Sequence, residues 1–154
     1  MSPVTIEIPS GPTVFGHLVL DFTGTLSQGG TLLPGVADRL QRLAGDLQIT
    51  ILTADTFGTV EKETADLPVV VRIIADGREK AGVVAGMGPD QVIAVGNGRN
   101  DIPMMDVAGI GIAVLGPEGS AAGLLQAADI VTRDINEALD LVLEPLRIKA
   151  TLRD

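Results

Sequence analysis

The amino-acid sequence predicts an α/β fold in which helices cover both faces of a mainly parallel central sheet. Strand-like and helix-like segments alternate along the chain, as they do when parallel strands are joined by crossover helices. The strand-like segments are short and rich in branched apolar residues, which is typical of strands buried on both faces. With 154 residues, 45% of them hydrophobic, the chain is sized for one core. We therefore expect residues 1–154 to form a single domain.

The N-terminal extension, residues 1–16, is expected to form a small β-hairpin. Val4–Ile8 alternates at period two, Pro9–Pro12 contains turn residues, and Thr13–Leu20 resumes an extended run. This hairpin would lead directly into the central strand.

Helices and strands then follow one another. Pro34 can occupy the first turn of a helix, and Val36, Leu40 and Leu43 fall on one face of that helix, which Gly45 ends. The further predicted segments are a strand over 47–52, a helix over 56–67, a strand over 69–74, a helix over 79–87, a strand over 91–95, a helix over 101–107, a strand over 110–114, a helix over 120–127 and a short edge strand at 130–131. The strand over 69–74 reads as one covered on both faces.

The last helix begins at Asp134, whose side chain can cap it together with Glu137. Its apolar stripe is predicted to run to Leu146 through Ile135, Ala138, Leu139 and Val142. The remaining tail, residues 147–154, is expected to be frayed.

Charge and composition exclude several classes of function. A formal net charge of −9 disfavours nucleic acid and anionic lipid as partners, so an anionic substrate must meet local cations. The chain lacks cysteine, tryptophan and tyrosine, which leaves no thiolate metal site and few stacking platforms. Residues 1–10 lack a secretory-signal pattern, and no apolar run reaches about 18 residues. We therefore expect a soluble, cytoplasmic protein without a membrane partner.

Asp21 stands at the end of the buried run His17–Leu20 and just before the turn at Gly24. Desolvating a carboxylate there costs several kcal/mol unless a cation or donors compensate, so Asp21 either has a chemical task or merely starts a turn. His17, the single histidine, is interpreted as structural.

Two later residues, Thr53 and Lys80, likewise allow either a chemical role or an ordinary structural one. Thr53 ends the next strand, where its hydroxyl could donate to a phosphoryl oxygen, although a β-branched residue is common at a strand end. Lys80 begins a helix, where it could pair with Asp21 and an incoming phosphate, although an exposed helical lysine is common.

The stretch Asp21-Phe22-Thr23-Gly24-Thr25-Leu26 resembles the phosphorylation motif Asp-Lys-Thr-Gly-Thr-Leu of the P-type ATPases, and so the first motif of the haloacid dehalogenase superfamily. The resemblance implies the Rossmann-like three-layer α/β/α sandwich of that superfamily, with Asp21 as a nucleophile that becomes an aspartyl phosphate. It implies Thr53 and Lys80 as the second and third motifs.

The stretch Gly96-Asn97-Gly98-Arg99-Asn100-Asp101-Ile102-Pro103-Met104-Met105 resembles the fourth motif of the P-type ATPases. A dinucleotide fingerprint fails here because Asp101 occupies its third glycine position. Oxygens from this loop and from Asp21 suit a hard cation such as Mg²⁺. The predicted metal ligands are Asp21, the Thr23 carbonyl and Asn97, with Asp101 bound directly or through water.

The phosphoryl group is expected to be bound by Lys80, by Thr53 and Ala54, and by the segment after the nucleophile, residues Phe22, Thr23 and Gly24. Two departures from the superfamily pattern bear on turnover. Thr23 stands where most of its phosphatases have an acid–base Asp, and a threonine hydroxyl does not titrate near neutral pH. Asn97 replaces a metal-binding Asp. Catalytic roles are therefore predicted for Asp21, Thr23, Thr53 and Lys80, with slow dephosphorylation.

The spacing between motifs leaves no room for an inserted cap or nucleotide-binding domain. The leading prediction is a capless, Mg²⁺-dependent phosphohydrolase that acts on phosphate monoesters. Its substrate would be a small phosphorylated molecule or a phosphoprotein. One alternative is a regulatory or interaction module that binds Mg²⁺ and a phosphoryl group without efficient turnover. Another alternative is a partner subunit whose catalysis needs a further chain to supply the acid or the cap. Separately, the subunits of a homo-oligomer could cover the open site.

Overall fold

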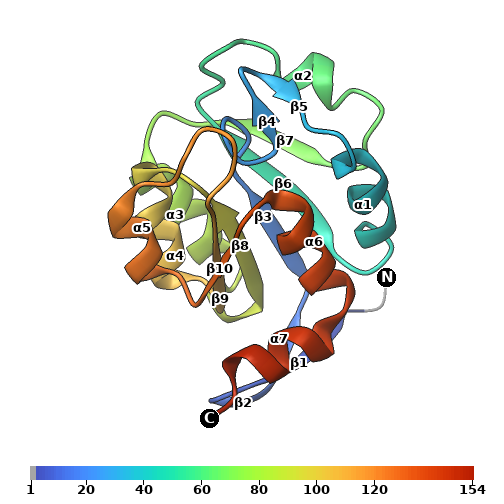
Figure 1. The fold of residues 1–154 in the computed structure, drawn as a ribbon, viewed down its shortest axis with the longest axis vertical. Helices are drawn as coiled ribbons and strands as arrows, with labels where there is room; N and C mark the ends of the chain where they lie inside the picture. Colours follow the sequence, from blue (N-terminus) through green and yellow to red (C-terminus); the bar gives the residue numbers. More distant parts are fainter. Residues whose placement is uncertain (1–2) are drawn as a thin grey trace.

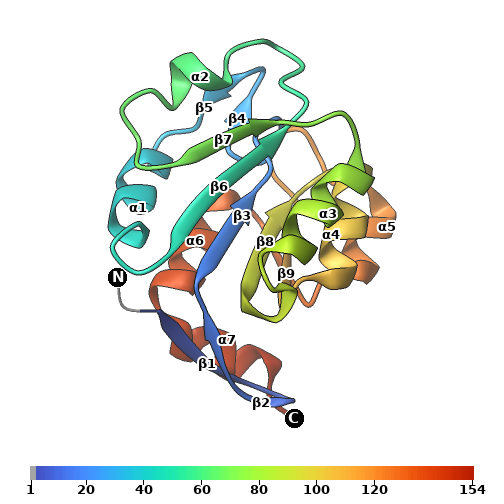
Figure 2. The same ribbon diagram turned by 180° about the vertical axis from the view of Figure 1, so that it is seen from behind.

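A computed structural model describes residues 3–154; residues 1 and 2 of the predicted hairpin extension lie outside the described range. Its centre is a six-stranded sheet with the order β10-β9-β8-β3-β6-β7 (Figures 1 and 2), and every neighbouring pair in it is parallel. These strands are β3 (His17–Leu20), β6 (Gln48–Thr53), β7 (Val70–Ile73), β8 (Val92–Gly96), β9 (Ile110–Val114) and β10 (Ile130–Thr132). The predicted α/β class is confirmed.

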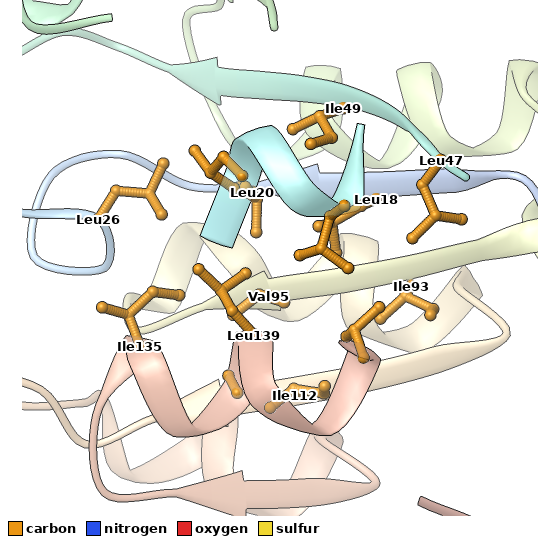
Figure 3. Packing of buried hydrophobic residues seen from close by; sticks show 14 of the residues in the cluster. Leu18, Leu20, Leu26, Leu47, Ile49, Ile93, Val95, Ile112, Ile135 and Leu139 are labelled. Atoms are coloured by element: carbon orange, nitrogen blue, oxygen red, sulfur yellow. The ribbon is translucent and has the colours of Figure 1, made fainter. Parts of the chain in front are cut away.

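Helices cover both faces of this sheet. Buried side chains of α1 (Val36–Leu43) and α6 (Ile135–Leu143) share one core cluster with alternate strand residues (Figure 3). On the opposite face the helices are α3 (Gly77–Gly86), α4 (Ile102–Val107) and α5 (Ala122–Ala127). Along β3, Leu18 and Leu20 face the first cluster and Val19 faces the second, as the period of two in a strand requires. The result is a three-layer sandwich.

The predicted N-terminal hairpin is present as β1 (Val4–Ile8) paired antiparallel with β2 (Gly11–Phe15). It lies at the opposite end of the molecule from the carboxyl ends of the central strands (Figure 1), and α7 (Pro145–Leu152) packs against β1. Lys149 of α7 forms an ion pair with Glu7 at 2.7 Å.

The prediction for the C-terminus was wrong. Residues 147–152 are helical rather than frayed, and the helix that begins after the Asp134 cap ends at Leu143 instead of continuing through Leu146. Pro145 causes the break, because its ring disfavours helical dihedrals in the preceding residue and it cannot donate a backbone hydrogen bond. Leu146 consequently points into solvent with 77% of its surface exposed, and Ile148 carries the buried contact.

Two other elements differ from prediction. The helix expected over 56–67 is a single turn, α2 (Val60–Glu63). Strand β7 is the edge of the sheet rather than a strand covered on both faces, with Val70 and Ile73 46% and 57% exposed.

No inserted domain separates the central strands. Between Asp21 and Lys80 the chain forms only the short hairpin of β4 (Ser27–Gln28) and β5 (Thr31–Leu32), α1, β6, α2 and β7. Over the described range, 3–154, there is no helix of sufficient length and apolarity to cross a membrane.

Candidate functional site

The predicted strand-end residues meet at one edge of the sheet. Asp21 directly follows β3, Thr53 is the last residue of β6, and Asn97 directly follows β8. The chain leaves β3 toward β6 and β7 and then returns to β8 on the other side of β3, so strand order reverses here. Ligands of open parallel sheets bind beyond the carboxyl ends of the strands at such a reversal.

A pocket of about 420 Å³ occupies this position. It is lined by Asp21, Thr23, Thr53, Ala54, Thr56, Asn97, Gly98, Arg99, Asn100 and Glu118.

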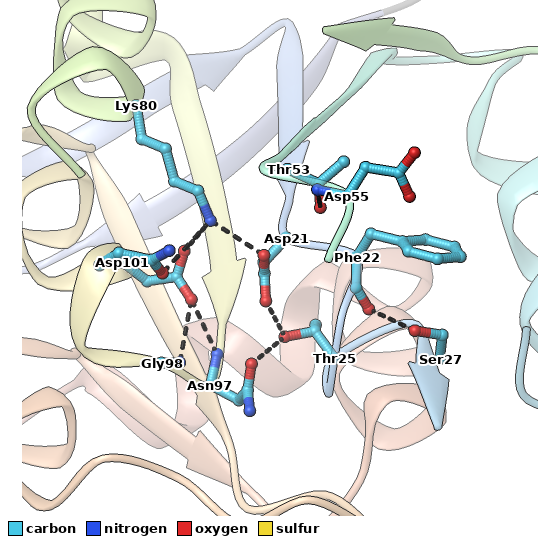
Figure 4. Close-up of polar contacts among 11 residues, drawn as sticks. Asp21, Phe22, Thr25, Ser27, Thr53, Asp55, Lys80, Asn97, Gly98 and Asp101 are labelled. Atoms are coloured by element: carbon cyan, nitrogen blue, oxygen red, sulfur yellow. Dashed lines mark hydrogen bonds and ion pairs between the residues drawn. The ribbon is translucent and has the colours of Figure 1, made fainter. Parts of the chain in front are cut away.

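Behind the pocket lies a buried charge cluster (Figure 4). The ammonium Nζ of Lys80 is 2.9 Å from Asp21 Oδ1 and 2.7 Å from Asp101 Oδ1, and Lys80 is completely buried. It is therefore not the exposed helical lysine of the alternative interpretation. Helix α3 delivers it, because the Asp76 side chain caps the helix by accepting from the Glu79 N–H, which fixes the first turn.

The electrostatics follow from two carboxylates sharing one cation. Burial, reinforced by the charge of Asp101, raises the pKa of Asp21 to about 6, although Lys80 and the Thr25 hydroxyl oppose the rise. Burial alone would lower the pKa of Lys80, but the two carboxylates outweigh it and raise that pKa above its usual value. Lys80 thus remains a fixed positive charge beside a carboxylate that is ionised above about pH 6.

Asp101 serves this cluster rather than the pocket. Its Oδ1 accepts from Lys80, while its Oδ2 accepts the backbone N–H groups of Asn97 and Gly98 at 3.1 and 3.0 Å. Gly96 permits the close approach, since a Cβ there would lie 2.3 Å from Asp101 Oδ2. With both oxygens engaged and no exposed surface, Asp101 orients the loop after β8.

The loop after Asp21 is closed on itself. The Phe22 carbonyl accepts from the N–H groups of Leu26 and Ser27, and the Phe22 side chain is buried in the core. The N–H of Gly24 donates to the Ser27 carbonyl, so it is not available to a phosphoryl group as predicted; Gly24 is required by its φ of +78° and by the amide of Asn97 packed against it.

Thr53 is held in a donating orientation. Its Oγ1 accepts from the backbone N–H of Asp55 at 2.9 Å, which leaves the hydroxyl hydrogen free to point into the pocket. Asp55 has φ +56° and accepts from the N–H groups of Thr59 and Val60, so this turn is fixed before α2. Ala54 lies exposed at the pocket wall.

Oxygen donors for a cation are present but few. In the range 3–154 no three His, Cys, Asp or Glu side chains form a group that could hold a metal. The predicted ligand residues Asp21, Thr23 and Asn97 nevertheless all line the pocket, and Mg²⁺ needs few protein ligands because it keeps several waters. The residues therefore fit Mg²⁺, with Asp101 supporting them from behind.

Residues that sequence reasoning did not assign also belong to the site. Thr25 Oγ1 lies 3.0 Å from Asp21 Oδ2 and 3.0 Å from Asn97 Oδ1, so its single proton serves one of them at a time. Arg99 and Glu118 line the pocket. Thr25 could have been found from its place inside the first motif. Glu118 could have been found because it follows a predicted strand, as the other site residues do.

His17 lies at the start of β3, the end remote from Asp21, in agreement with a structural role.

Comparison with known proteins agrees with this geometry. Residues 75–142 match the family model of haloacid dehalogenase-like hydrolases. The chain is 48% identical over 64 residues to an uncharacterized protein of Methanocaldococcus jannaschii, 69% of which is covered, and 41% identical over 58 residues to a phosphoglycolate phosphatase of Halorubrum lacusprofundi, of which only 24% is covered.

Solved structures share the whole fold. The cobalt-bound deoxy-D-mannose-octulosonate 8-phosphate phosphatase of Haemophilus influenzae superposes with a TM-score of 0.73 at 15% identity, covering 91% of this chain and 94% of that one. The 3-deoxy-D-manno-octulosonate 8-phosphate phosphatase of Moraxella catarrhalis, solved with magnesium, phosphate and its sugar acid, gives 0.69 at 18% identity, covering 88% and 90%. The chain therefore has the Rossmann-like α/β/α fold of these phosphatases, and residues 75–142 are similar to haloacid dehalogenase-like hydrolases.

Proposed function

We propose that this protein is a Mg²⁺-dependent phosphohydrolase that cleaves phosphate monoesters through an aspartyl phosphate on Asp21. The observation that carries the proposal is Lys80, buried between Asp21 and Asp101 beside an open pocket at the strand ends. A fixed cation in that position lets a carboxylate and a phosphate approach each other. The phosphatases among the similar proteins support the same reaction class.

In the first half-reaction a carboxylate oxygen of Asp21 attacks phosphorus, the bond between phosphorus and the leaving oxygen breaks, and the departing alkoxide takes a proton from water. Lys80 balances the charge of the nucleophile, and the free hydroxyl hydrogen of Thr53 donates to a phosphoryl oxygen. Asp21, the Thr23 carbonyl and Asn97 would hold Mg²⁺. When bound, the cation neutralises charge on the phosphoryl oxygens.

The second half-reaction is expected to be slow because Thr23 cannot act as an acid or base near neutral pH. This agrees with the resemblance of the first motif to the P-type ATPases, in which the same threonine accompanies a long-lived aspartyl phosphate. The pocket is open and uncapped, so a homo-oligomer could cover it and a phosphoprotein could reach it.

The test is phosphate release from p-nitrophenyl phosphate by the wild type, Asp21→Asn and Thr23→Asp, with and without Mg²⁺. We expect slow metal-dependent turnover in the wild type and none in Asp21→Asn. Turnover by Thr23→Asp should be faster than that of the wild type by about tenfold or more. Equal activity of Asp21→Asn would contradict the proposal. Silence of all three, with Mg²⁺-dependent binding of beryllium fluoride, would favour the regulatory module instead.

A further inference from the structure

Glu118 belongs to the loop after β9 and is held beside the segment that follows Asp21. Its Oε2 accepts the backbone N–H of Gly29, in the β4–β5 hairpin, at 2.8 Å. On one side of Glu118, Gly116 packs against the Gly24 carbonyl so closely that a Cβ there would lie at 3.0 Å. On the other side, the carbonyl of Gly119 accepts from Asn97 Nδ2 at 3.0 Å. Three separate contacts therefore hold this loop at the site.

Among the residues that line the pocket, Asp21 and Glu118 are the carboxylates. Asp21 is committed to Lys80 and Thr25, whereas one oxygen of Glu118 is tethered to Gly29 and its Oε1 has no protein partner among residues 3–154. Within that range Glu118 forms no metal-holding group with Asp21 and Asp101. The pocket thus contains a second carboxylate that serves neither the buried charge cluster nor a three-acid metal site.

We propose that Glu118 is the general base of the second half-reaction, in place of the carboxylate missing at Thr23. This inference rests on the proposed function. Glu118 accepts a proton from a water molecule in the pocket as the water oxygen forms its bond to phosphorus. The bond between phosphorus and the Asp21 oxygen breaks at the same time, so its electron pair returns to Asp21 as a carboxylate. Inorganic phosphate and protonated Glu118 are the products, and the proton then passes to solvent.

The experiment follows the decay of the phosphoenzyme. The protein is phosphorylated with radiolabelled acetyl phosphate and Mg²⁺, excess donor is removed, and the acid-stable label is counted over time in the wild type, Glu118→Gln and Glu118→Ala. Glutamine can still accept the Gly29 N–H but cannot act as a base, so it separates tethering from catalysis. Glu61→Gln, an exposed glutamate of α2 outside the pocket, is the matched control.

We expect the adduct to live about 10²-fold longer in both Glu118 variants than in the wild type and Glu61→Gln. Adding Thr23→Asp to Glu118→Gln should restore decay. Decay of the Glu118→Gln adduct at the wild-type rate would overturn the proposal. If only the Glu118→Ala adduct decayed slowly, Glu118 would have a structural role through its bond to Gly29 and would not be the base. If the wild type forms no adduct on Asp21, the proposed function itself fails and the role of Glu118 falls with it.

Discussion

At the scale of single residues, Lys80 is the side chain on which the buried charges depend. Removing one partner of a buried ion pair leaves an uncompensated charge, so Lys80→Met, which strands Asp21 and Asp101, should lower the free energy of unfolding by about 3–5 kcal/mol at neutral pH. The deficit should shrink in acid, where the carboxylates protonate. Urea unfolding measures both effects, with Lys62→Met, at an exposed lysine, as control. A loss below about 1 kcal/mol would contradict the electrostatic account.

A second residue-scale prediction concerns pH. The pKa of Asp21 is about 6 in the folded protein and near its ordinary value of 3.8 when unfolded. Between these values the folded state binds more protons, so stability contributed by this group falls as pH rises from about 4 to about 6. In EDTA, Asp21→Asn should therefore gain stability relative to wild type between about pH 4 and about pH 7. A constant difference across that range, by urea unfolding, would contradict the raised pKa.

At the scale of elements, the attachment of α7 provides a matched pair of substitutions. Ile148 is fully buried against the hairpin side of the core, while Leu146, two residues earlier, is 77% exposed. Ile148→Ala should cost about 2–4 kcal/mol through lost burial and a cavity, and Leu146→Ala less than about 0.5 kcal/mol. Thermal and urea unfolding would distinguish them. Equal effects would favour the continuous Asp134–Leu146 stripe that the sequence suggested.

Most elements of the sheet were predictable because a buried parallel strand needs a short apolar run, and the helices alternate with such runs. The failures have local causes. Pro145 interrupts a helix whose apolar pattern in the sequence continues to Leu146. The helix expected over 56–67 forms only the single turn α2. The exposure of Val70 and Ile73 could not be predicted, because an edge strand and a central strand differ by strand order, not by composition.

The candidate site was predictable to the extent that its residues stand at strand ends. Asp21, Thr53 and Asn97 meet as expected, and Lys80 reaches Asp21. The engagement of both Asp101 oxygens and the Gly24 N–H inside the protein was not predictable, because it depends on which way each donor points. Glu118 also follows a predicted strand, but its contact with Gly29, 89 residues away in the sequence, was not predictable.

At the scale of the whole molecule, the formal charge of −9 opposes the approach of an anionic substrate. Screening weakens that repulsion, so kcat/KM for an aryl phosphate should rise as NaCl increases from about 10 mM to about 100 mM at fixed Mg²⁺. Steady-state kinetics over this range would test it. A fall in kcat/KM would mean that Arg99 and the bound cation make the local field attractive instead.

The central claim is that Asp21 accepts a phosphoryl group. The most direct test is to incubate the protein with acetyl phosphate and Mg²⁺, quench in acid, and locate the added phosphoryl group by peptide mass spectrometry. Our account predicts a hydroxylamine-labile adduct on Asp21 that requires Mg²⁺ and disappears in Asp21→Asn. Phosphate release without any adduct on Asp21, or an adduct that persists in Asp21→Asn, would contradict it.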